Sequence, residues 1–257
     1  MSALPPRAGP SRRARPGHNP AEVAAKAPLD LLAEEVAACT ACPRLVAWRE
    51  HAAAHPPAAH AGEPYWARPV PGFGDPAARL VIVGLAPGAH GANRTGRMFT
   101  GDRSGDFLFA ALERAGFANQ ASSTGRDDGL ALDGAYVTAV VRCAPPANRP
   151  SPEERDRCVD FLRRELTLLP EWRVVLALGQ FAFEALWRLP EIVPHQVVVP
   201  RPRFAHGLEV RLARKTRGAA AATLICSYHP SQRNVFTGRL DATMFDAILA
   251  RARSLGA

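Results

Sequence analysis

Four segments of the sequence combine residue types that bind ligands, and each follows an apolar run. They are GLAPGAHGANRTGRMFTGD at 84–102, RCAPPANRPS at 142–151, GQFAF at 179–183 and HPSQRN at 229–234. The first is rich in glycine, which lets a backbone pass close to a flat ligand or a phosphate. It has neither the Lys-Ser/Thr ending of a P-loop nor the G-x-G-x-x-G pattern of dinucleotide-binding proteins. The sequence therefore does not indicate a nucleotide cofactor.

His229 directly follows the last apolar run and precedes Pro230. A histidine in this position can donate a hydrogen bond to negative charge that develops on a leaving group. The alternative is a histidine that only caps the turn before Pro230. The position makes His229 a candidate catalytic residue.

Four of the five cysteines form two pairs, Cys39 with Cys42 and Cys143 with Cys158. Four thiolates suit either zinc or an iron-sulfur cluster. Structural zinc sites usually combine two close pairs, and the second pair here is widely spaced, so the cluster is favoured. Four unligated cysteines are the remaining alternative. Cys226 lies inside an apolar run and is interpreted as a small buried hydrophobic residue.

Short apolar runs alternate along the chain with helical patterns. The runs at 79–84, 135–141, 173–179 and 222–228 are continuous, as in strands that are buried on both faces. Helical spacing is found at 28–39, 106–116, 151–169, 180–189 and 240–253. This alternation predicts an α/β protein whose parallel sheet has helices on both faces. In such folds the ligand lies beyond the carboxyl ends of the strands, which is where all four segments above are placed.

Local signals add detail to this prediction. Ser151, Pro152 and Glu154 form a capping box at the start of one helix. A short strand pair is expected around 195–200 and 208–213, while residues 49–75 show no steady period and are interpreted as an irregular connection.

The bulk composition suggests a partner. The 257 residues carry a net charge of +8, mostly from arginine, whose planar fork matches phosphate oxygens. Residues 1–27 are rich in Pro, Arg and Ala and are predicted to be a disordered basic tail, followed by one domain over 28–257. The chain has no secretory signal and no apolar run of about 18 residues. We therefore expect a cytoplasmic monomer whose cysteines are reduced.

The first segment, HPSQRN and the cysteine spacing together resemble the family 5 uracil-DNA glycosylases, the iron-sulfur type of bacteria that is often called type B. The resemblance extends from about Leu31 to Arg253. It implies a three-layer α/β/α fold around a central four-stranded parallel sheet, and a structural 4Fe-4S cluster held by Cys39, Cys42, Cys143 and Cys158. It also implies hydrolysis of the N-glycosidic bond of uracil in DNA, which releases the base and leaves an abasic site, with hypoxanthine and ethenocytosine as further bases.

The resemblance also implies roles for the base-binding residues. Phe99 matches the aromatic residue that stacks on the base after it has been flipped out of the duplex. His229 would donate a hydrogen bond to a carbonyl oxygen of the departing base. The other residues expected to bind substrate are Gly84, Ala86, Gly88 and Asn93.

The residue that would hold the attacking water departs from the family pattern. Many relatives have Asp or Asn immediately after the first strand, whereas this chain has GLAPG, without a polar side chain. We expect Asp102 to take this role, with Asn148 as a second polar group. The alternative for Asp102 is a helix N-cap, a position that Asp favours and that Ser104 or Asp106 could equally fill.

DNA contacts are expected from two segments. Gln232, Arg233 and Asn234 match the loop that enters the minor groove, and Arg94 and Arg97 are expected to contact phosphates. Two other functional classes remain possible: a metal-containing nucleic-acid-binding module without catalysis, and an iron-sulfur enzyme that acts on free nucleotides.

Overall fold

The computed structural model describes residues 26–192, 200–212 and 222–256. The predicted disordered tail over 1–27 lies outside these ranges except for its last two residues. The first member of the expected strand pair, at 195–200, also lies outside them except for Pro200. No helix in the described ranges is long and apolar enough to cross a membrane.

A six-stranded sheet in the order β1-β3-β2-β4-β6-β5 forms the centre of the fold. Its four inner strands are parallel and confirm the predicted four-stranded core, and the short edge strands β1 and β5 are antiparallel to their neighbours. The bounds are β1 Phe73–Gly74, β2 Leu80–Gly84, β3 Ala135–Ala139, β4 Val174–Leu178, β5 Glu209–Leu212 and β6 Ala222–Ser227. Strand β5 is the second member of the expected edge pair.

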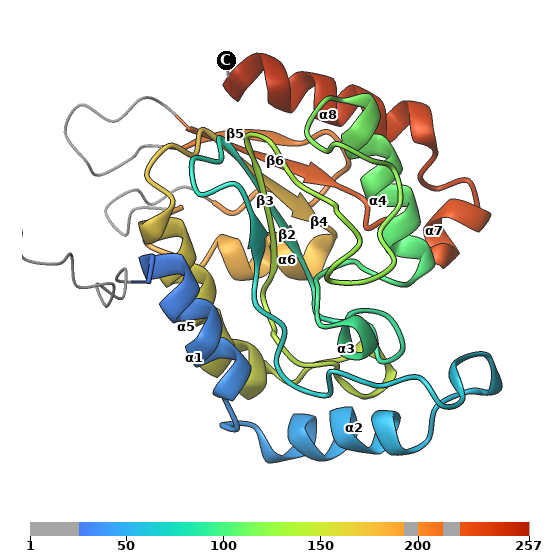
Figure 1. The fold of residues 1–257 in the computed structure, drawn as a ribbon. Coiled ribbons are helices and arrows are strands. Elements are labelled where there is room, and N and C mark those ends of the chain that lie inside the picture. The colour runs from blue at the N-terminus through green and yellow to red at the C-terminus, as the bar shows by residue number, and fades with distance from the viewer. Residues whose placement is uncertain (1–25, 193–199, 213–221, 257) are drawn as a thin grey trace, which may run out of the picture.

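Helices cover both faces of the sheet, which gives the predicted three layers (Figure 1). One face is packed by α4 and α8, and the other by α5 and α6, with α1 lying against α5. Neighbouring residues in a strand point to opposite faces, so Leu80 and Ile82 join one core while Val81 and Val83 join the other. The bounds are α1 Pro28–Ala38, α4 Arg103–Arg114, α5 Pro152–Leu168, α6 Gln180–Leu186 and α8 Ala242–Gly256.

Four short helical segments lie around the ends of these layers. They are η1 Ala58–His60, α3 Ala92–Thr95, η2 Pro146–Asn148 and α7 Gln232–Phe236. The capping box of α5 is present, because the Ser151 side chain accepts from the Glu154 N–H while the Glu154 carboxylate accepts from the Ser151 N–H. This fixes the start of α5 directly after a strand-end segment.

The interpretation of residues 49–75 as irregular was wrong in its first part. Helix α2 runs over Pro43–Ala54, with Pro43 in its first turn. Its buried side chains are Leu45, Arg49 and Ala52, which lie on one side of the helix. Because a charged residue occupies the middle of this buried stripe, the apolar period that would reveal a helix is interrupted.

A buried ion pair joins the first residue of the second strand-end segment, Arg142, to Glu165 of α5. The Arg142 guanidinium donates to the Glu165 carboxylate at 2.6 Å, and both side chains are almost fully buried. Thr138 and Tyr136 donate to the same carboxylate at 2.7 and 3.4 Å. The network therefore satisfies charges that burial would otherwise make unfavourable.

We expect Glu165→Ala to lower the free energy of unfolding by about 3–5 kcal/mol, because it leaves the Arg142 charge buried without its partner. Glu35 is the matched control, since it pairs with Arg164 of the same helix on the exposed surface. Glu35→Ala is expected to change stability by no more than about 1 kcal/mol. Urea unfolding of both variants makes the comparison, and equal effects would contradict the role of the buried pair.

Candidate active site

A cavity of about 1150 Å³ opens at the carboxyl ends of the parallel strands. Residues that follow three different strands line it, among them Leu85 after β2, Asn148 after β3 and His229 after β6. Phe99 and Asp102 line it from the long loop between β2 and α4. The cavity therefore lies at the strand ends, where the sequence predicts the site.

Phe99 lines this cavity in a strained backbone conformation. Its φ of 53° is in the left-handed region, which a bulky side chain rarely adopts. The ring lies over Gly84, where a Cβ atom would come within 2.6 Å of the ring carbon Cζ. It is stacked against the His229 imidazole, with 5.9 Å between the ring centroids and 28° between the planes. Gly84 thus acts indirectly, by leaving room for the aromatic ring.

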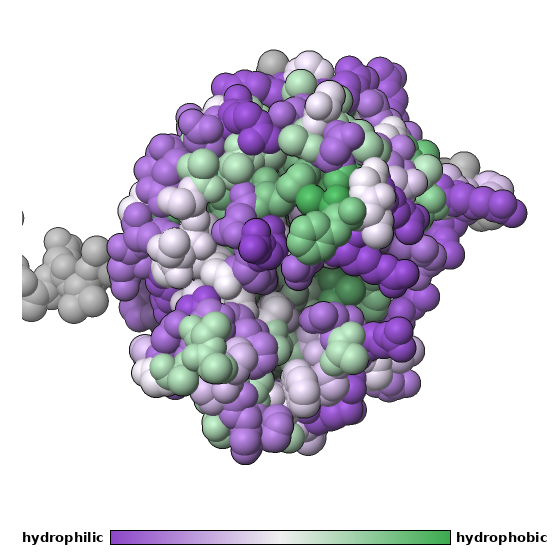
Figure 2. All heavy atoms as spheres, turned by 90° about the vertical axis from the view of Figure 1, so that its right-hand side faces the viewer, coloured by the Kyte–Doolittle hydropathy of each residue, from purple (hydrophilic) through white to green (hydrophobic). Residues whose placement is uncertain are grey.

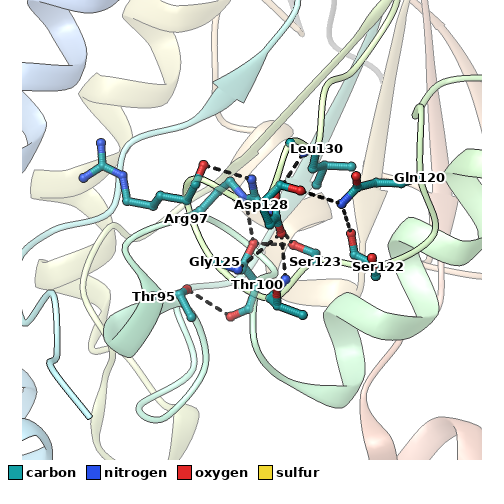
Figure 3. A network of polar contacts seen from close by, with 12 residues as sticks. Thr95, Arg97, Thr100, Gln120, Ser122, Ser123, Gly125, Asp128 and Leu130 are labelled. Carbon is teal, nitrogen blue, oxygen red and sulfur yellow. Dashed lines mark hydrogen bonds and ion pairs between the residues drawn. The ribbon is translucent and has the colours of Figure 1, made fainter.

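A network of hydrogen bonds centred on Arg97 holds the strained backbone of Phe99 (Figure 3). The Arg97 guanidinium donates to Asp128 at 2.6 Å, to Ser123 at 3.0 Å and to the Thr100 hydroxyl at 3.0 Å. Burial favours the neutral form of Asp128, but hydrogen bonds from Arg97 and three backbone N–H groups keep its pKa well below the usual range. Because the contacts flank Phe99 on both sides in the sequence, they fix the ring in the cavity.

This network corrects the prediction for Arg97. Its side chain is buried and does not line the cavity, so the structure does not support a contact with a DNA phosphate. Arg94 does line the cavity, but its guanidinium donates to the Glu63 carboxylate at 2.6 Å and to the Gly101 carbonyl at 3.1 Å. Arg94 therefore ties the two sides of the long loop together.

The two carboxylate oxygens of Asp102 have different surroundings. Its Oδ1 accepts from the Gly105 N–H at 3.0 Å, so Asp102 is the N-cap of α4, as the alternative interpretation held. Its Oδ2 lies over the glycine-rich turn, where Cβ atoms at Gly91 and Gly88 would come within 2.2 and 3.0 Å of it. Desolvation by burial raises the pKa of this carboxyl group. The same side chain can therefore start the helix and present a carboxylate oxygen to the cavity.

His229 is held as a neutral imidazole. Its backbone carbonyl accepts from the Asn234 side-chain amide at 2.9 Å, and its side chain packs against Gly179, which follows β4. Burial lowers the pKa of His229 to about 4, so the ring carries one N–H and no charge at neutral pH. Such a ring is a hydrogen-bond donor that needs no proton from solvent.

Of the other predicted site residues, some line the cavity and others lie outside its lining. Gly88, Asn148, Gln232 and Arg233 line the cavity, the last three with exposed side chains at its mouth. Asn234 is half-buried and does not line the cavity, and its amide supports the backbone of His229; a contact of Asn234 with DNA stays a prediction.

Asn93 and Ala86 are also outside the cavity lining. Asn93 is fully buried and its amide donates to the carbonyls of Arg49 and Ala89 at 3.2 Å each, so the structure does not support a contact with substrate. Ala86 is half-buried and packs against the core on the α5 and α6 side. Both residues shape the loop from behind.

Several residues of the site were not predicted. Gly179 was visible only as the start of the strand-end segment GQFAF, and Gly91 as one glycine among several. His90 lines the cavity, where its Nδ1 lies 2.9 Å from the Tyr65 hydroxyl. Asp128, which holds Arg97, comes from a long connection without a periodic pattern, and no sequence signal marks it.

The four paired cysteines line one small cavity. Cys39 and Cys42 precede α2, Cys143 lies in the segment that follows β3, and Cys158 lies on α5. The Arg142 backbone N–H donates to the Cys158 sulfur at 3.2 Å, and the Arg49 guanidinium donates to the Cys143 sulfur at 3.2 Å. Among the described residues, no group of three or more His, Cys, Asp or Glu side chains has the arrangement of a single-ion site. Cys226 is fully buried in β6, as predicted.

The geometry of the main cavity suits one kind of chemistry. An aromatic ring offers a platform for a planar ligand, a neutral imidazole N–H lies beside that ring, and a carboxylate faces the glycine turn. A donor and a carboxylate on one cavity can serve the two poles of a bond that breaks into an anion and a carbocation. This is the arrangement needed to cleave a bond between a flat leaving group and a sugar.

Comparison with known proteins assigns the chain to a protein superfamily. Residues 71–253 match the family model described as the uracil DNA glycosylase superfamily, and the chain belongs to that superfamily. Within it, relatives with about half their residues identical carry the name type-5 uracil-DNA glycosylase, and the chain belongs to this family, as the resemblance implied.

Three of these relatives span bacteria and archaea. The protein of Mycobacterium tuberculosis is 51% identical over 221 residues, which cover 86% of this chain and 79% of the relative. The protein of Thermus thermophilus is 50% identical over 222 residues, which cover 86% and 95%. The protein of Pyrobaculum aerophilum is 43% identical over 214 residues, which cover 83% and 87%.

Proposed function

We propose that this protein is a monofunctional uracil-DNA glycosylase, which hydrolyses the bond between uracil and deoxyribose and leaves an abasic site. The observation that carries the proposal is the convergence of Phe99, Asp102 and His229 in one cavity at the strand ends. Relatives of the same superfamily with about half their residues identical bear this name.

In the proposed reaction the nucleotide leaves the duplex and its base lies on Phe99. The bond from C1′ to the base nitrogen breaks with both electrons moving to the base, so that the sugar becomes cationic and the base anionic. The His229 N–H donates to the base carbonyl oxygen and stabilises this anion. Asp102 Oδ2 accepts a hydrogen bond from the water whose oxygen bonds to C1′, and takes up its proton.

DNA is the proposed partner, bound by a monomer in a reducing compartment such as the cytoplasm. Arg233 and Gln232 are exposed at the cavity mouth, where they can reach a duplex whose extruded base is inside. The net charge of +8 supports binding to phosphates. Asn148, which also lines the cavity, is proposed as a second polar contact for the base or the water.

We further propose that hypoxanthine and ethenocytosine are substrates beside uracil. A ring platform recognises the flat face that all these bases share, and the cavity volume of about 1150 Å³ accommodates two-ring bases. Discrimination would then rest on how readily each base leaves its pair, and weak pairs lower that energy.

Release of free base from a duplex with one deoxyuridine tests the function, with an unmodified duplex of the same sequence as control. We expect release of uracil only, with an abasic site left in an uncut strand. Binding of DNA without release of any of the three bases would contradict catalysis and favour the non-catalytic binding module. Turnover of free deoxyuridine nucleotides would favour the small-molecule enzyme.

We also propose that Cys39, Cys42, Cys143 and Cys158 hold a structural 4Fe-4S cluster. The four residues surround one cavity, and N–H donors from Arg142 and Arg49 approach two of the sulfurs, as suits anionic thiolates. A cluster here would link the segment before α2 to the sheet and add its binding energy to folding.

Cys143→Ser is expected to lose bound iron and visible colour, and to give less soluble protein, before it affects the chemistry of the remaining folded fraction. Cys226→Ala is the matched control, because Cys226 is also buried but lies away from the other four. Iron content and absorbance per folded protein are the measurements. A Cys143→Ser protein with full iron and stability would contradict the proposed ligand set, and zinc in the wild type would contradict the cluster.

A further inference from the structure

An exposed aromatic side chain stands beside the candidate active site without a role in the proposed reaction. Two large apolar side chains are well exposed among the described residues, Leu31 at 53% and Phe236 at 74%. Single exposed apolar residues are common on protein surfaces, so position decides whether one matters. Phe236 ends the short helix α7, which begins three residues after His229.

The spacing within α7 places Phe236 beside the residues at the cavity mouth. Phe236 is four residues after Gln232 and three after Arg233, and residues so spaced lie on one side of a helix. Both Gln232 and Arg233 line the candidate active site. A ligand that contacts Gln232 or Arg233 therefore lies close to the Phe236 ring.

A second hollow, of about 310 Å³, lies between α4 and α7 and continues from the first. Phe107, Val235 and Phe236 form its apolar walls. Its other walls are Arg103, Asp106 and Gln232, all three of which also line the candidate active site. Figure 2 shows this side of the molecule, with apolar side chains gathered near the centre among hydrophilic ones.

The charges around this hollow indicate what kind of partner fits. Arg103 lines this hollow, and Arg233 lines the adjoining candidate active site. Both arginines are exposed, and no ion pair of either with another described residue is found. A partner that is flat and apolar in one part and anionic in another matches an aromatic ring with guanidinium groups near it. A nucleotide has this combination, since its base has a stacking face and its phosphate a charge.

We propose that Phe236 stacks on a base of the DNA that flanks the extruded nucleotide, while Arg103 and Arg233 contact the adjoining phosphates. The proposal rests on the proposed function, because it takes the first cavity to hold the extruded base. It adds a second aromatic contact outside the catalytic cavity. Stacking of this kind is tolerant of sequence, so it would strengthen binding beside any damaged base.

The test compares Phe236→Ala, Phe236→Trp and Leu31→Ala with the wild type. Leu31→Ala is the control, because it removes the other exposed apolar side chain, on a helix that packs against α5. Binding is measured by titration with a duplex that carries an abasic-site analogue. A fluorescent 2-aminopurine next to a deoxyuridine that resists cleavage reports stacking directly.

Phe236→Ala is expected to weaken binding by about 10- to 100-fold and to remove the protein-dependent change in 2-aminopurine fluorescence. Phe236→Trp should restore both, and Leu31→Ala should alter neither. At saturating enzyme, the rate of base release by Phe236→Ala should stay within a few-fold of the wild type, because the ring does not touch the reacting bond.

Unchanged affinity and fluorescence in Phe236→Ala would overturn the proposal. So would a loss of self-association in that variant with DNA binding intact, since the ring would then belong to a contact between two copies. Failure of the wild type to release uracil would instead contradict the proposed function. The two failures are distinguishable, because binding and fluorescence are read without turnover.

Discussion

Replacing Asp102 with asparagine is expected to lower the single-turnover rate of uracil release by about 10²- to 10⁴-fold, the usual range for a lost acid–base group. Asparagine is as good an N-cap as aspartate, so the hydrogen bond to the Gly105 N–H and the start of α4 are retained. The change removes only the charge of Oδ2, which lies over Gly88 and Gly91. Rapid-quench measurement at saturating enzyme isolates this chemical step.

The pH dependence gives a second test of Asp102. Because burial raises the pKa of this carboxyl group above its ordinary value of 3.8, it takes up a proton at a higher pH than an exposed aspartate. The wild-type rate should therefore fall as the pH is lowered, and this fall should be absent from Asp102→Asn. Asp106→Asn is the control, since Asp106 is an exposed carboxylate on the same cavity. A rate for Asp102→Asn within a few-fold of the wild type would leave Asp102 only its role as a cap.

His229→Ala is expected to lower the same rate by about 10²- to 10³-fold, as is found when one donor to a developing anion is removed. The imidazole is stacked with Phe99, and in the proposed reaction its N–H donates to a base bound on that ring. His229→Gln keeps a neutral N–H donor and should recover part of the loss. Equal rates for the alanine and glutamine variants would mean that the ring acts by packing alone.

The neutral state of His229 also predicts that the rate of base release does not change with pH around the ordinary histidine pKa. Since burial lowers the pKa of His229 to about 4, its protonation state is constant across the neutral range. The rate should show no step near the ordinary histidine pKa of about 6.5. A step there that disappears in His229→Gln would show that the charged imidazole takes part in the reaction.

The sheet and its site could be predicted because their signals are local and redundant. Continuous apolar runs mark buried strands, and alternation with helices leaves few topologies for them. The ligand site then follows from the rule that cavities in such sheets lie at the strand ends. Helix α2 was partly missed because Arg49 is buried in its middle, where its partners are a cysteine sulfur and a backbone carbonyl.

The roles of individual polar residues in the loop could not be predicted in the same way. Arg97 and Asn93 have the composition of ligand-binding residues, yet both are turned inward. Arg97 is held by Asp128, which is 31 residues away in the sequence, and Asn93 by the carbonyl of Arg49, 44 residues away. The residue type determines which hydrogen bonds a side chain can form. Whether it forms them with substrate or with the rest of the protein depends on partners that are distant in the sequence and become neighbours only in the folded chain.

The contacts of Arg49 have a consequence for the smallest unit that can work. Its carbonyl holds Asn93 of the glycine-rich loop, and its guanidinium lies on Cys143. The backbone N–H of Ala67 donates to the Asn93 carbonyl as well. Residues 26–70 thus lie outside the region matched by the superfamily model and still brace the loop that carries Phe99. A fragment that begins at residue 71 would keep all six strands of the sheet. It would lose the hydrogen bonds with Arg49 and Ala67 that hold Asn93 and, with it, the active-site loop.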